Sequence, residues 1–423
     1  MCGGVEMILR INGGVKLCGS VKVHGAKNSI LPIMAASILA EGESVIHNCP
    51  DLRDVDVSIK ILNHLGCRVS RSGSTVTIDS STMNHSDIPD ALMREMRSSV
   101  IFLGAILART GEAVLSYPGG CELGPRPIDL HLKALRTLGA DIEEKGGNII
   151  CKVKEFRAGR IDLPIPSVGA TENAMLMASR CRGQTVITNA AREPEIEDLQ
   201  AYLRRLGVNI HGAGTSIITI EGQPCKKSVE HKIIPDRIVA ATYALAVASA
   251  GGRAEILNIE PRHFSTVTDV LKEAGCDLEI GPDSLKIICE RPLRAVRPIV
   301  TAPYPGFPTD AQPPLMAASL KFEGTTVFVE NIFENRYRHI SELRRMGADI
   351  RTEGRVALIC GRKELHGASV EATDLRGGAA LAVAALGAIG ESRISGLKHI
   401  DRGYERLEVA LSNLGADVVR IEE

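Results

Sequence analysis

Several residue types and patterns are missing from this 423-residue chain, and each absence argues against a class of protein. The chain has no tryptophan, and aromatic residues make up only 3% of it, so it lacks a basic surface interleaved with aromatic side chains. Its 50 basic and 51 acidic residues give a net charge of −1, and no basic run breaks this balance. We therefore expect no nucleic-acid partner.

Long hydrophobic runs are missing as well. The longest apolar stretches, residues 239–250 and 379–389, are rich in alanine and too short to cross a bilayer, so we interpret them as buried helices. The first six residues, MCGGVE, lack the charged and apolar segments of a secretory signal. These features favour a cytoplasmic protein that does not insert into a membrane.

The eleven cysteines include no Cys-x-x-Cys pair, and no two histidines have the spacing of zinc ligands. An odd number of scattered cysteines favours free thiols in a reducing compartment. The chain also lacks a glycine-rich dinucleotide fingerprint. We therefore expect neither a bound metal nor a cofactor.

Pairs of glycines recur six times along the chain. The second glycine of each pair ends an amphipathic segment, as a left-handed helix cap would, and the first ends an alanine-rich segment and begins a strand. The second glycines are Gly66, Gly139, Gly207, Gly275, Gly347 and Gly415, and the first are Gly42, Gly111, Gly183, Gly252, Gly324 and Gly390. Six such pairs predict a repeat protein.

Each repeat is expected to run strand, helix, strand, helix, strand, strand. The first copy illustrates this order, with strands at 21–23, 44–47, 68–71 and 75–79 and helices at 28–39 and 55–65. Three copies can enclose one globule with its helices inside and its sheets outside, and two such globules fit the length. No stretch resembles a flexible linker, so we expect the chain to pass between domains by strand crossings, one of them near Asp236.

Two insertions interrupt the spacing of the glycines. The interval within a pair is 28 residues in the second copy and 23 to 25 elsewhere, and the excess falls in residues 118–127, around Cys121. The interval to the next pair is 49 residues across segment 301–310 and 43 to 45 elsewhere, and this segment ends in Asp310. Insertions in repeat proteins usually carry function, so Cys121 and Asp310 are candidate catalytic residues.

Each candidate has an alternative interpretation. A cysteine is most often a small buried hydrophobic residue, but Cys121 lies in a loop of glycines and prolines beside Arg126, which would favour the thiolate. Such a thiol suits a proton donor or a nucleophile. Asp310 can be a general base, or it can cap the helix that follows it. The residues alone leave this choice open.

Cationic residues stand at the ends of several predicted elements. They are Lys27, Arg97, Arg126, Arg336, Arg376 and Arg402. Any single arginine can be a solvated surface charge, but similar positions in several repeats predict a pocket for more than one phosphate or carboxylate. The turn 167–171 before a predicted helix also suits a phosphate, although it lacks the lysine of a P-loop.

Eight ordered motifs resemble the enolpyruvyl transferase family. They are residues 25–28 (GAKN), 118–131, 167–171 (SVGAT), 189–195 (NAAREPE), 307–310 (FPTD), 333–336 (FENR), 374–376 (DLR) and 399–406 (HIDRGYER). Within the family, the chain is most similar to the members that act on UDP-N-acetylglucosamine. The resemblance covers the whole chain and implies two inside-out α/β barrel domains with a cleft between them. Residues 26–235 would form the domain with the Cys121 loop, and residues 1–25 together with 236–423 the other.

The resemblance implies addition and elimination at phosphoenolpyruvate. The 3-hydroxyl of UDP-N-acetylglucosamine attacks C2 while C3 is protonated, and phosphate then leaves, which is the first committed step of peptidoglycan precursor synthesis. Cys121 would be the proton donor and form a covalent adduct with phosphoenolpyruvate, and Asp310 would be the general base. Both partners are small molecules.

By the same resemblance, further residues receive roles. Those implied in catalysis are Cys121, Asp310, Lys27, Arg402, Asp236 and Asp374. Those implied in substrate binding are Lys27, Asn28, Arg97, Arg126, Pro127, Ile128, Asp129, Leu130, Ser167, Val168, Gly169, Asp310, Ile332, Arg336, Arg376 and Arg402.

Two positions depart from the family pattern: His24 stands where serine is common, and Pro313 and Pro314 follow Gln312. Two alternatives are carried beside this hypothesis. One is a shikimate-phosphate enolpyruvyl transferase, although that branch lacks the Pro-Gly-Gly-Cys loop. The other is a catalytically idle paralogue that binds a UDP-sugar as a regulator.

Overall fold

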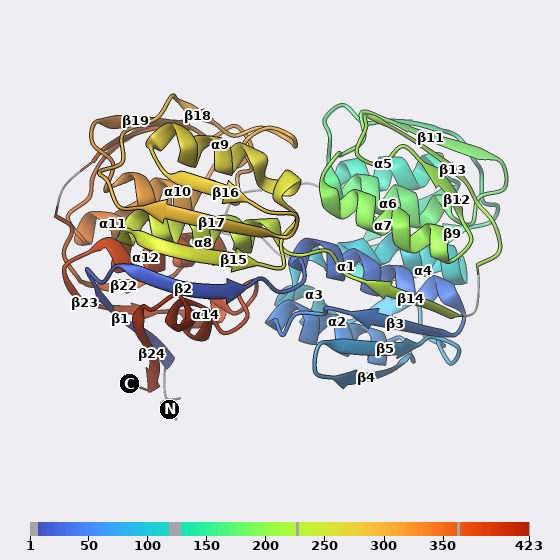
Figure 1. Cartoon of the computed structure of the whole chain (residues 1–423). Coiled ribbons are helices and arrows are strands. Elements are labelled where there is room, and N and C mark those ends of the chain that lie inside the picture. Colours follow the sequence, from blue (N-terminus) through green and yellow to red (C-terminus); the bar gives the residue numbers. More distant parts are fainter. Residues whose placement is uncertain (1–6, 118–127, 226–227, 362–363, 423) are drawn as a thin grey trace. The chain divides into compact units, whose positions relative to one another are not determined.

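The structure is a computed structural model that describes residues 7–117, 128–225, 228–361 and 364–422, and these residues form two compact units (Figure 1). Unit 1 contains residues 7–24 and 235–422, and unit 2 contains residues 25–117 and 128–234. Each unit repeats the order strand, helix, strand, helix, strand, strand. The α/β fold predicted from the repeats is therefore confirmed.

Unit 2 contains the following elements in chain order: α1 (Lys27–Ala36), η1 (Ser37–Ala40), β3 (Glu43–His47), α2 (Arg53–His64), β4 (Arg68–Ser72), β5 (Thr75–Asp79), β6 (Asp87–Ile88), α3 (Asp90–Glu95), η2 (Arg97–Ile101), α4 (Phe102–Thr110), β7 (Glu112–Ser116), α5 (Asp129–Thr137), β8 (Ala140–Lys145), β9 (Asn148–Val153), β10 (Arg160–Asp162), α6 (Val168–Ala178), β11 (Gln184–Thr188), α7 (Pro194–Arg205), β12 (Asn209–His211), β13 (Ile217–Glu221) and β14 (Ser228–Lys232).

Unit 1 contains two strands from the amino-terminal end and the remainder of the chain: β1 (Met7–Gly13), β2 (Leu17–Lys22), α8 (Arg237–Ala250), β15 (Gly252–Leu257), η3 (Pro261–Phe264), α9 (Ser265–Ala274), β16 (Asp277–Ile280), β17 (Ser284–Cys289), β18 (Ile299–Val300), α10 (Gln312–Ser319), β19 (Thr325–Val329), α11 (Ile340–Arg345), β20 (Asp349–Glu353), β21 (Val356–Cys360), β22 (Ser369–Glu371), α12 (Leu375–Gly387), β23 (Gly390–Ser395), α13 (Leu397–Ile400), α14 (Leu407–Asn413) and β24 (Asp417–Glu422).

The described residues form six four-stranded sheets of one design. In the sheet β14-β3-β5-β4, the first two strands are parallel and the other neighbours antiparallel. Two first strands are exchanged between repeats, because β2 pairs in parallel with β15, and β14 pairs in parallel with β3. The chain therefore leaves one unit and enters the other after residues 24 and 234.

The core of each unit surrounds three inner helices, α1, α4 and α6 in unit 2 and α8, α10 and α12 in unit 1, with the sheets outside them (Figure 1). These helices are apolar and buried almost all round, as expected for central helices. Helix α8 includes residues 239–250 and α12 includes most of 379–389, so the interpretation of both stretches as buried helices is confirmed.

The glycines that end the outer helices have the expected left-handed backbone. Gly66, Gly139, Gly207, Gly275, Gly347 and Gly415 have φ between 87° and 107°. In the first repeat, the left-handed position after the inner helix falls on Glu41, with φ 55°, one residue before the glycine of that pair. The glycine pairs thus mark real chain reversals with a shift of one residue in one copy.

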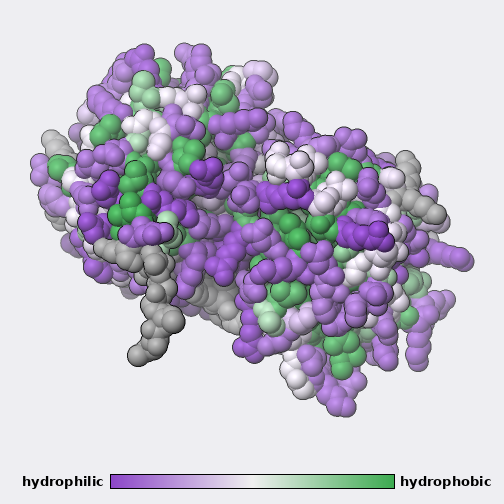
Figure 2. Space-filling model, turned by 90° about the horizontal axis from the view of Figure 1, so that it is seen from below, coloured by the Kyte–Doolittle hydropathy of each residue, from purple (hydrophilic) through white to green (hydrophobic). Residues whose placement is uncertain are grey.

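Expected element boundaries were wrong where pairing between repeats decides them. The first strand was expected at 21–23, but β2 spans Leu17–Lys22 because it pairs along all six residues of β15. The first inner helix begins at Lys27, and its α-helical part ends at Ala36 before a 3₁₀ turn. Among the described residues, no helix has both the length and the apolar character needed to cross a membrane. The face in Figure 2 is largely hydrophilic, with scattered hydrophobic patches.

Candidate active site

Each unit gathers candidate residues at the starts of its inner helices. In unit 1, Asp310 lies two residues before the first residue of α10 and forms an ion pair with Arg376, which is the second residue of α12. In unit 2, Asn173 of α6 donates a hydrogen bond to the carbonyl of Val100 in η2, just before α4. The amino-terminal ends of neighbouring inner helices therefore lie together within each unit.

Asp310 lies between two buried guanidinium groups. Nη2 of Arg336 donates to its Oδ1 at 2.9 Å, and Nε and Nη2 of Arg376 donate to its Oδ2 at 3.2 and 3.1 Å. The arginine side chains are 1% and 3% exposed, and the carboxylate is 28% exposed. Such charge-assisted bonds fix the carboxylate in one orientation while leaving part of it accessible.

The helix-cap alternative for Asp310 is wrong. The residue that caps α10 is Ala311, and no side chain accepts a hydrogen bond there. Pro313 lies in the first turn of this helix, where the missing amide hydrogen costs little, so the two prolines are compatible with its start. Asp310 is instead a partner of arginines.

The loop before α11 holds Arg336 in place. Arg336 also donates from Nε and Nη2 to the carbonyl of Thr309, at 3.2 and 2.9 Å. Glu330, 1% exposed, accepts from the hydroxyl of Thr309 and from the amides of Ile332 and Phe333. The candidate residues Ile332, Arg336 and Asp310 are thus joined through two short loops.

Arg376 lies in a buried polar cluster. Its guanidinium carbon is 5.4 Å from the centre of the Tyr404 ring, and the Tyr404 hydroxyl is 2.9 Å from that of Thr242. Burial acts to lower the pKa of Arg376, but the charge of Asp310 and the neighbouring Tyr404 and Asp236 oppose it, and the net shift is upward. Arg376 therefore stays protonated inside the unit.

Two further aspartates cap inner helices of unit 1. Asp374 Oδ1 accepts from the amides of Arg376 and Gly377 at 3.1 and 2.9 Å, and its buried Oδ2 has no hydrogen-bond partner among the described residues. Asp236 Oδ1 accepts from the amides of Ile238 and Val239 at 2.9 and 3.0 Å. These bonds satisfy amides that a helix start leaves open.

Arg402 belongs to a segment of unit 1 that forms a hydrogen bond with His24. Arg402 is half-buried in the turn that follows α13. Ring atom Nε2 of His24 lies 3.4 Å from the backbone nitrogen of Glu405, which donates to it. The histidine at this unusual position therefore supports the segment that carries Arg402.

Lys27 opens α1 in unit 2 and forms a buried ion pair. Its Nζ lies 2.8 Å from Oδ2 of Asp54, and the two side chains are 11% and 1% exposed. Asp54 comes from the first turn of α2, where a carboxylate is favoured by the helix dipole. Asn28 follows in α1 and is half-buried.

Ser167, Val168 and Gly169 form the start of α6. The Ser167 hydroxyl accepts from the amide of Ala170 at 3.4 Å, a long capping bond. A Cβ on Gly169 would lie 2.6 Å from Cε1 of His131, so any other residue there would displace the buried His131 ring. The predicted turn before a helix is therefore found, and its glycine has a packing role.

His131 lies on α5 and contacts α6. Its Nδ1 is 2.9 Å from Nδ2 of Asn173, whose Oδ1 accepts from the amide of Gly104 at 2.6 Å. Burial lowers the pKa of His131 to about 4, against the opposing charge of Asp129. The imidazole is therefore neutral near neutral pH and acts as a hydrogen-bond acceptor.

The remaining described candidates of unit 2 lie near the starts of η2 and α5. Arg97 is half-buried at the start of η2, Ile128 is buried before α5, and Asp129 and Leu130 begin α5 with exposed and half-buried side chains. Cys121, Arg126 and Pro127 lie outside the described residues. In the described part of the chain, no group of three or more His, Cys, Asp or Glu side chains could hold a metal ion.

The sequence reasoning missed several residues that support these candidates. They are Asp54, His131, Asn173, Glu330 and Tyr404. The motif containing His131 and the one containing Tyr404 were recognised, but their spacing did not indicate these contacts. No sequence signal indicated Asp54, because an aspartate in the first turn of a helix is usually an exposed residue.

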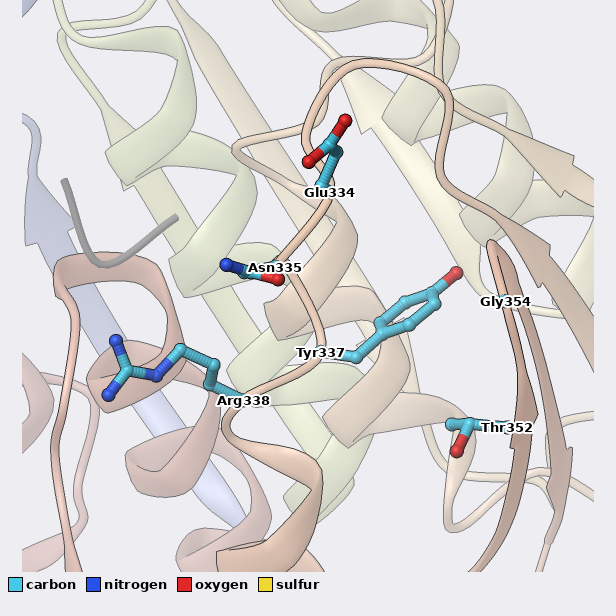
Figure 3. A pocket seen from close by; sticks show the side chains of 6 residues that line it. All are labelled: Glu334, Asn335, Tyr337, Arg338, Thr352 and Gly354. Atoms are coloured by element: carbon cyan, nitrogen blue, oxygen red, sulfur yellow. The ribbon is translucent and has the colours of Figure 1, made fainter. Parts of the chain in front are cut away.

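A cavity of about 310 Å³ lies elsewhere in unit 1 (Figure 3). It is lined by Glu334, Asn335, Tyr337, Arg338, Thr352 and Gly354. The Tyr337 ring points from its loop toward the hairpin of β20 and β21, and its hydroxyl donates to the carbonyl of Arg355 at 2.9 Å. The cavity is lined by residues next to Arg336 in the sequence but not by the buried ion pairs, so we do not assign it to the candidate active site.

Known proteins resemble this chain along nearly its whole length. The family model for EPSP synthase (3-phosphoshikimate 1-carboxyvinyltransferase) matches residues 11–411. The chain belongs to this family. The enolpyruvyl transferase resemblance expected from the motifs is therefore confirmed.

Two relatives within the family are named for the same activity. UDP-N-acetylglucosamine 1-carboxyvinyltransferase 2 of Caldanaerobacter subterraneus subsp. tengcongensis is 54% identical over 412 residues, which cover 97% of this chain and 99% of that protein. UDP-N-acetylglucosamine 1-carboxyvinyltransferase 1 of Symbiobacterium thermophilum is 48% identical over 417 residues, which cover 97% of this chain and 94% of that protein.

Solved structures of family members have the same fold. The enolpyruvyl transferase NikO from Streptomyces tendae matches with a TM-score of 0.89 and 27% identity, covering 99% of this chain and 100% of that one. EPSP synthase from Acinetobacter baumannii matches with a TM-score of 0.74 over 98% of this chain and 100% of that one. At 18% identity, the second likeness concerns the fold alone.

Proposed function

We propose that this protein transfers the enolpyruvyl group of phosphoenolpyruvate to the 3-hydroxyl of UDP-N-acetylglucosamine and releases phosphate. The observation that carries the proposal is the 54% identity, over nearly full length, to a UDP-N-acetylglucosamine 1-carboxyvinyltransferase. The reaction would be the first committed step of peptidoglycan precursor synthesis, carried out in the cytoplasm. The substrates bring a carboxylate, a phosphate and a diphosphate to one place, so cations have to offset their repulsion.

Lys27, Arg97, Arg126, Arg376 and Arg402 are proposed to supply that positive charge. The buried pairing of Lys27 with Asp54 supports this role, because it holds the ammonium at the start of α1 before a substrate arrives. Groups held in advance lose little freedom when a substrate binds. Asn28, the segment 126–130, Ser167, Val168, Gly169, Ile332 and Arg336 would position the UDP-sugar.

Asp310 is proposed as the base that takes the proton from the sugar hydroxyl. Its partial exposure and its ionic contacts with Arg336 and Arg376 support this role. An ionised carboxylate is the form that can accept a proton, and two arginines hold its oxygens in fixed directions. For proton transfer, the hydroxyl would have to approach the exposed side of the carboxylate.

Asp236 and Asp374 are proposed to take part near the reacting carbon atoms. The second oxygen of Asp374 supports this, because it is buried and has no hydrogen-bond partner in the described part of the chain, while the first oxygen caps α12. A carboxylate oxygen without a partner can accept a proton when the tetrahedral intermediate loses one from its methyl group. The donor of the first proton would be Cys121.

Phosphate release separates the proposal from its alternatives. Purified protein is incubated with phosphoenolpyruvate and either UDP-N-acetylglucosamine or shikimate 3-phosphate, and phosphate is measured over time. We expect release with the UDP-sugar only. Release with shikimate 3-phosphate would favour the other branch of the family, and binding of the UDP-sugar without turnover would favour an idle regulator.

The role of Cys121 can be tested by substitution. Cys121→Ser should lose covalent modification by the epoxide fosfomycin, measured by intact mass, and most of its turnover, because a serine hydroxyl is a far weaker acid than a thiol. Cys18→Ser is the matched control, since Cys18 is an exposed free cysteine on β2. A Cys121→Ser enzyme with unchanged turnover at neutral pH would show that the proton donor lies elsewhere.

A further inference from the structure

Unit 2 contains a buried polar network that none of the candidate roles uses. Its centre is Asp198 on α7, which is 5% exposed. The Ser29 hydroxyl donates to Oδ2 of Asp198, the amide of Ile234 donates to the same oxygen at 3.3 Å, and Nε2 of His231 lies 2.8 Å from Oδ1. One carboxylate therefore joins three separate segments of the unit.

The network continues into the core beside the same strand. The rings of His231 and Tyr202 are 5.6 Å apart and nearly perpendicular, and the Tyr202 hydroxyl lies 2.8 Å from that of Ser44. Ser29 and Tyr202 are 0% exposed and His231 is 2% exposed. Polar groups this deeply buried cost free energy when a partner is removed, so the segments they join are held tightly.

Two of these bonds act on the start of α1. Ser29 lies in the first turn of α1, two residues after Lys27. The carbonyl of Ile234 accepts from the amide of Ala26 at 2.8 Å, so Asp198 also holds the strand end that binds the residue just before Lys27. No side chain caps α1, since its N-cap residue is Ala26. The carboxylate of Asp198 therefore holds the first turn of α1 through the side chain of Ser29 and not as a cap of its amides.

Lys27 is consequently fixed from two sides. Asp54 of α2 holds its ammonium group at 2.8 Å, and Asp198 of α7 holds the backbone turn from which it extends. The first contact sets the position of the Lys27 ammonium group, and the second sets the position of the first turn of α1. Displacement of either by about 1 Å is large on the scale of catalytic positioning.

We propose that Asp198 is a positioning residue that fixes the start of α1, and with it Lys27 and Asn28, for binding phosphoenolpyruvate and the UDP-sugar. Ser29 and the Ile234 amide transmit this effect, and His231 orients the carboxylate. The consequence for catalysis rests on the proposed function, whereas the fixing of the α1 start does not.

Hydrogen–deuterium exchange tests the structural part without any substrate. Asp198→Ala should speed exchange of the amides in residues 26–31 by about tenfold or more, because Ser29 and Ile234 lose their buried acceptor. Asp198→Asn should stay close to the wild type, since its carbonyl oxygen can accept from Ser29 and Ile234 and its amide can donate to Nε2 of His231. Glu197→Gln is the matched control, because it removes an exposed carboxylate from the neighbouring position of α7.

Steady-state kinetics test the consequence. We expect KM for phosphoenolpyruvate to rise about 10- to 100-fold in Asp198→Ala and by a smaller factor in Ser29→Ala, with near wild-type values in Asp198→Asn and Glu197→Gln. A role in folding alone would lower the fraction of active enzyme, and thus apparent kcat, but leave KM unchanged. Ser29→Ala removes only one hydroxyl, so it reports on the network even if Asp198→Ala folds poorly.

The two measurements separate the possible failures. Unchanged exchange in residues 26–31 of both Asp198→Ala and Ser29→Ala would overturn the inference, whatever the activity. Faster exchange with an unchanged KM would overturn the link to substrate binding. A wild-type protein that releases no phosphate, but whose Asp198→Ala variant exchanges faster, would contradict the proposed function and leave the positioning of α1 supported.

Discussion

The two units share one repeat but differ in the charge at the starts of their inner helices. In unit 2, these starts carry Lys27, Arg97 and Ser167, at α1, η2 and α6. In unit 1, Asp236 and Asp374 are the N-cap residues of α8 and α12, and Asp310 lies just before the start of α10. Helices α8 and α12 of unit 1 therefore have capping carboxylates where α1 and α6 of unit 2 have Ala26 and Ser167.

The difference has a physical basis. A helix start carries partial positive charge, so a lysine or arginine beside it adds to a field that attracts anions, while an aspartate cancels the field and satisfies the open amides. In unit 1, the buried Arg336 and Arg376 pair with Asp310, so opposite charges lie next to each other in this site. Under the proposed function, the carboxylates of unit 1 would accept protons, and cations of both units would bind the anionic substrate groups.

The largest effect should follow from removing the charge of Asp310. In Asp310→Asn, Arg336 and Arg376 remain buried without a carboxylate, and the proposed base is lost. We expect turnover, measured by phosphate release, to fall about 10²- to 10⁴-fold. Asp269→Asn, which changes an exposed aspartate on α9 of the same unit, should retain wild-type turnover. Equal rates in the two variants would mean that the carboxylates of unit 1 have a structural role only.

The second effect concerns stability in unit 2. Asp54→Ala would leave the ammonium of Lys27 buried without its partner, and breaking a buried ion pair in this way costs about 3 to 5 kcal/mol. The Lys27→Met, Asp54→Ala double variant should recover part of that loss, because it leaves no unpaired charge. Free energies of unfolding from denaturant titrations give this comparison. A single variant as stable as the wild type would show that water replaces Asp54 at the ammonium.

The sequence predicted some features of the two units and could not predict others. The glycine pairs predicted the repeats and the inner helices, and the insertion ending in Asp310 directed attention to a loop whose carboxylate pairs with two buried arginines. The partner of Lys27 could not be predicted, because no spacing rule relates residue 27 to Asp54 on the next helix. The choice between base and cap for Asp310 needed the positions of Arg336 and Arg376, which lie 26 and 66 residues away in sequence.

The exchange of β2 and β14 was also beyond local patterns. Both β2 and β14 alternate between more and less buried residues, so this pattern does not tell which of them pairs with β3 and which with β15. The hydrogen bonds that decide the pairing are made with strands more than 180 residues away. A strand crossing near Asp236 was expected, but the residues that exchange sheets were fixed only by the three-dimensional contacts.

The third effect should be similar in both units, because each contains a buried histidine whose pKa is lowered by burial. Burial lowers the pKa of His131 to about 4, and it also lowers the pKa of His339 to about 4, where Asp374 opposes and Arg336 reinforces the shift. An unfolded histidine has a pKa near 6.5. As the pH falls from about 6.5 to about 4, the unfolded chain takes up a proton that the folded chain refuses, so stability is lost, by about 3 kcal/mol for each histidine.

His131→Gln and His339→Gln should therefore each flatten the acid side of the stability curve, while lowering stability modestly at neutral pH. The exposed His211 of β12 provides the control, and His211→Gln should leave the curve unchanged. The measurement is the free energy of unfolding at several pH values between about 7 and about 4. If only one of the two variants flattens the curve, only the histidine replaced in that variant contributes to the loss of stability in acid.

The smallest effect compares the two kinds of helix cap directly. Asp236 accepts two amide hydrogen bonds, at 2.9 and 3.0 Å, whereas Ser167 accepts one, at 3.4 Å. We therefore expect Asp236→Ala to lower the free energy of unfolding by about 1 to 2 kcal/mol and Ser167→Ala by about 0.5 kcal/mol. Because Asp236 is also a candidate for catalysis, the comparison is made on unfolding in denaturant and not on turnover. If Ser167→Ala lowered the free energy of unfolding as much as Asp236→Ala, the Ser167 hydroxyl would be a strong cap of α6. The amides at the start of α6 would then already be satisfied and would be less suited to binding a substrate anion.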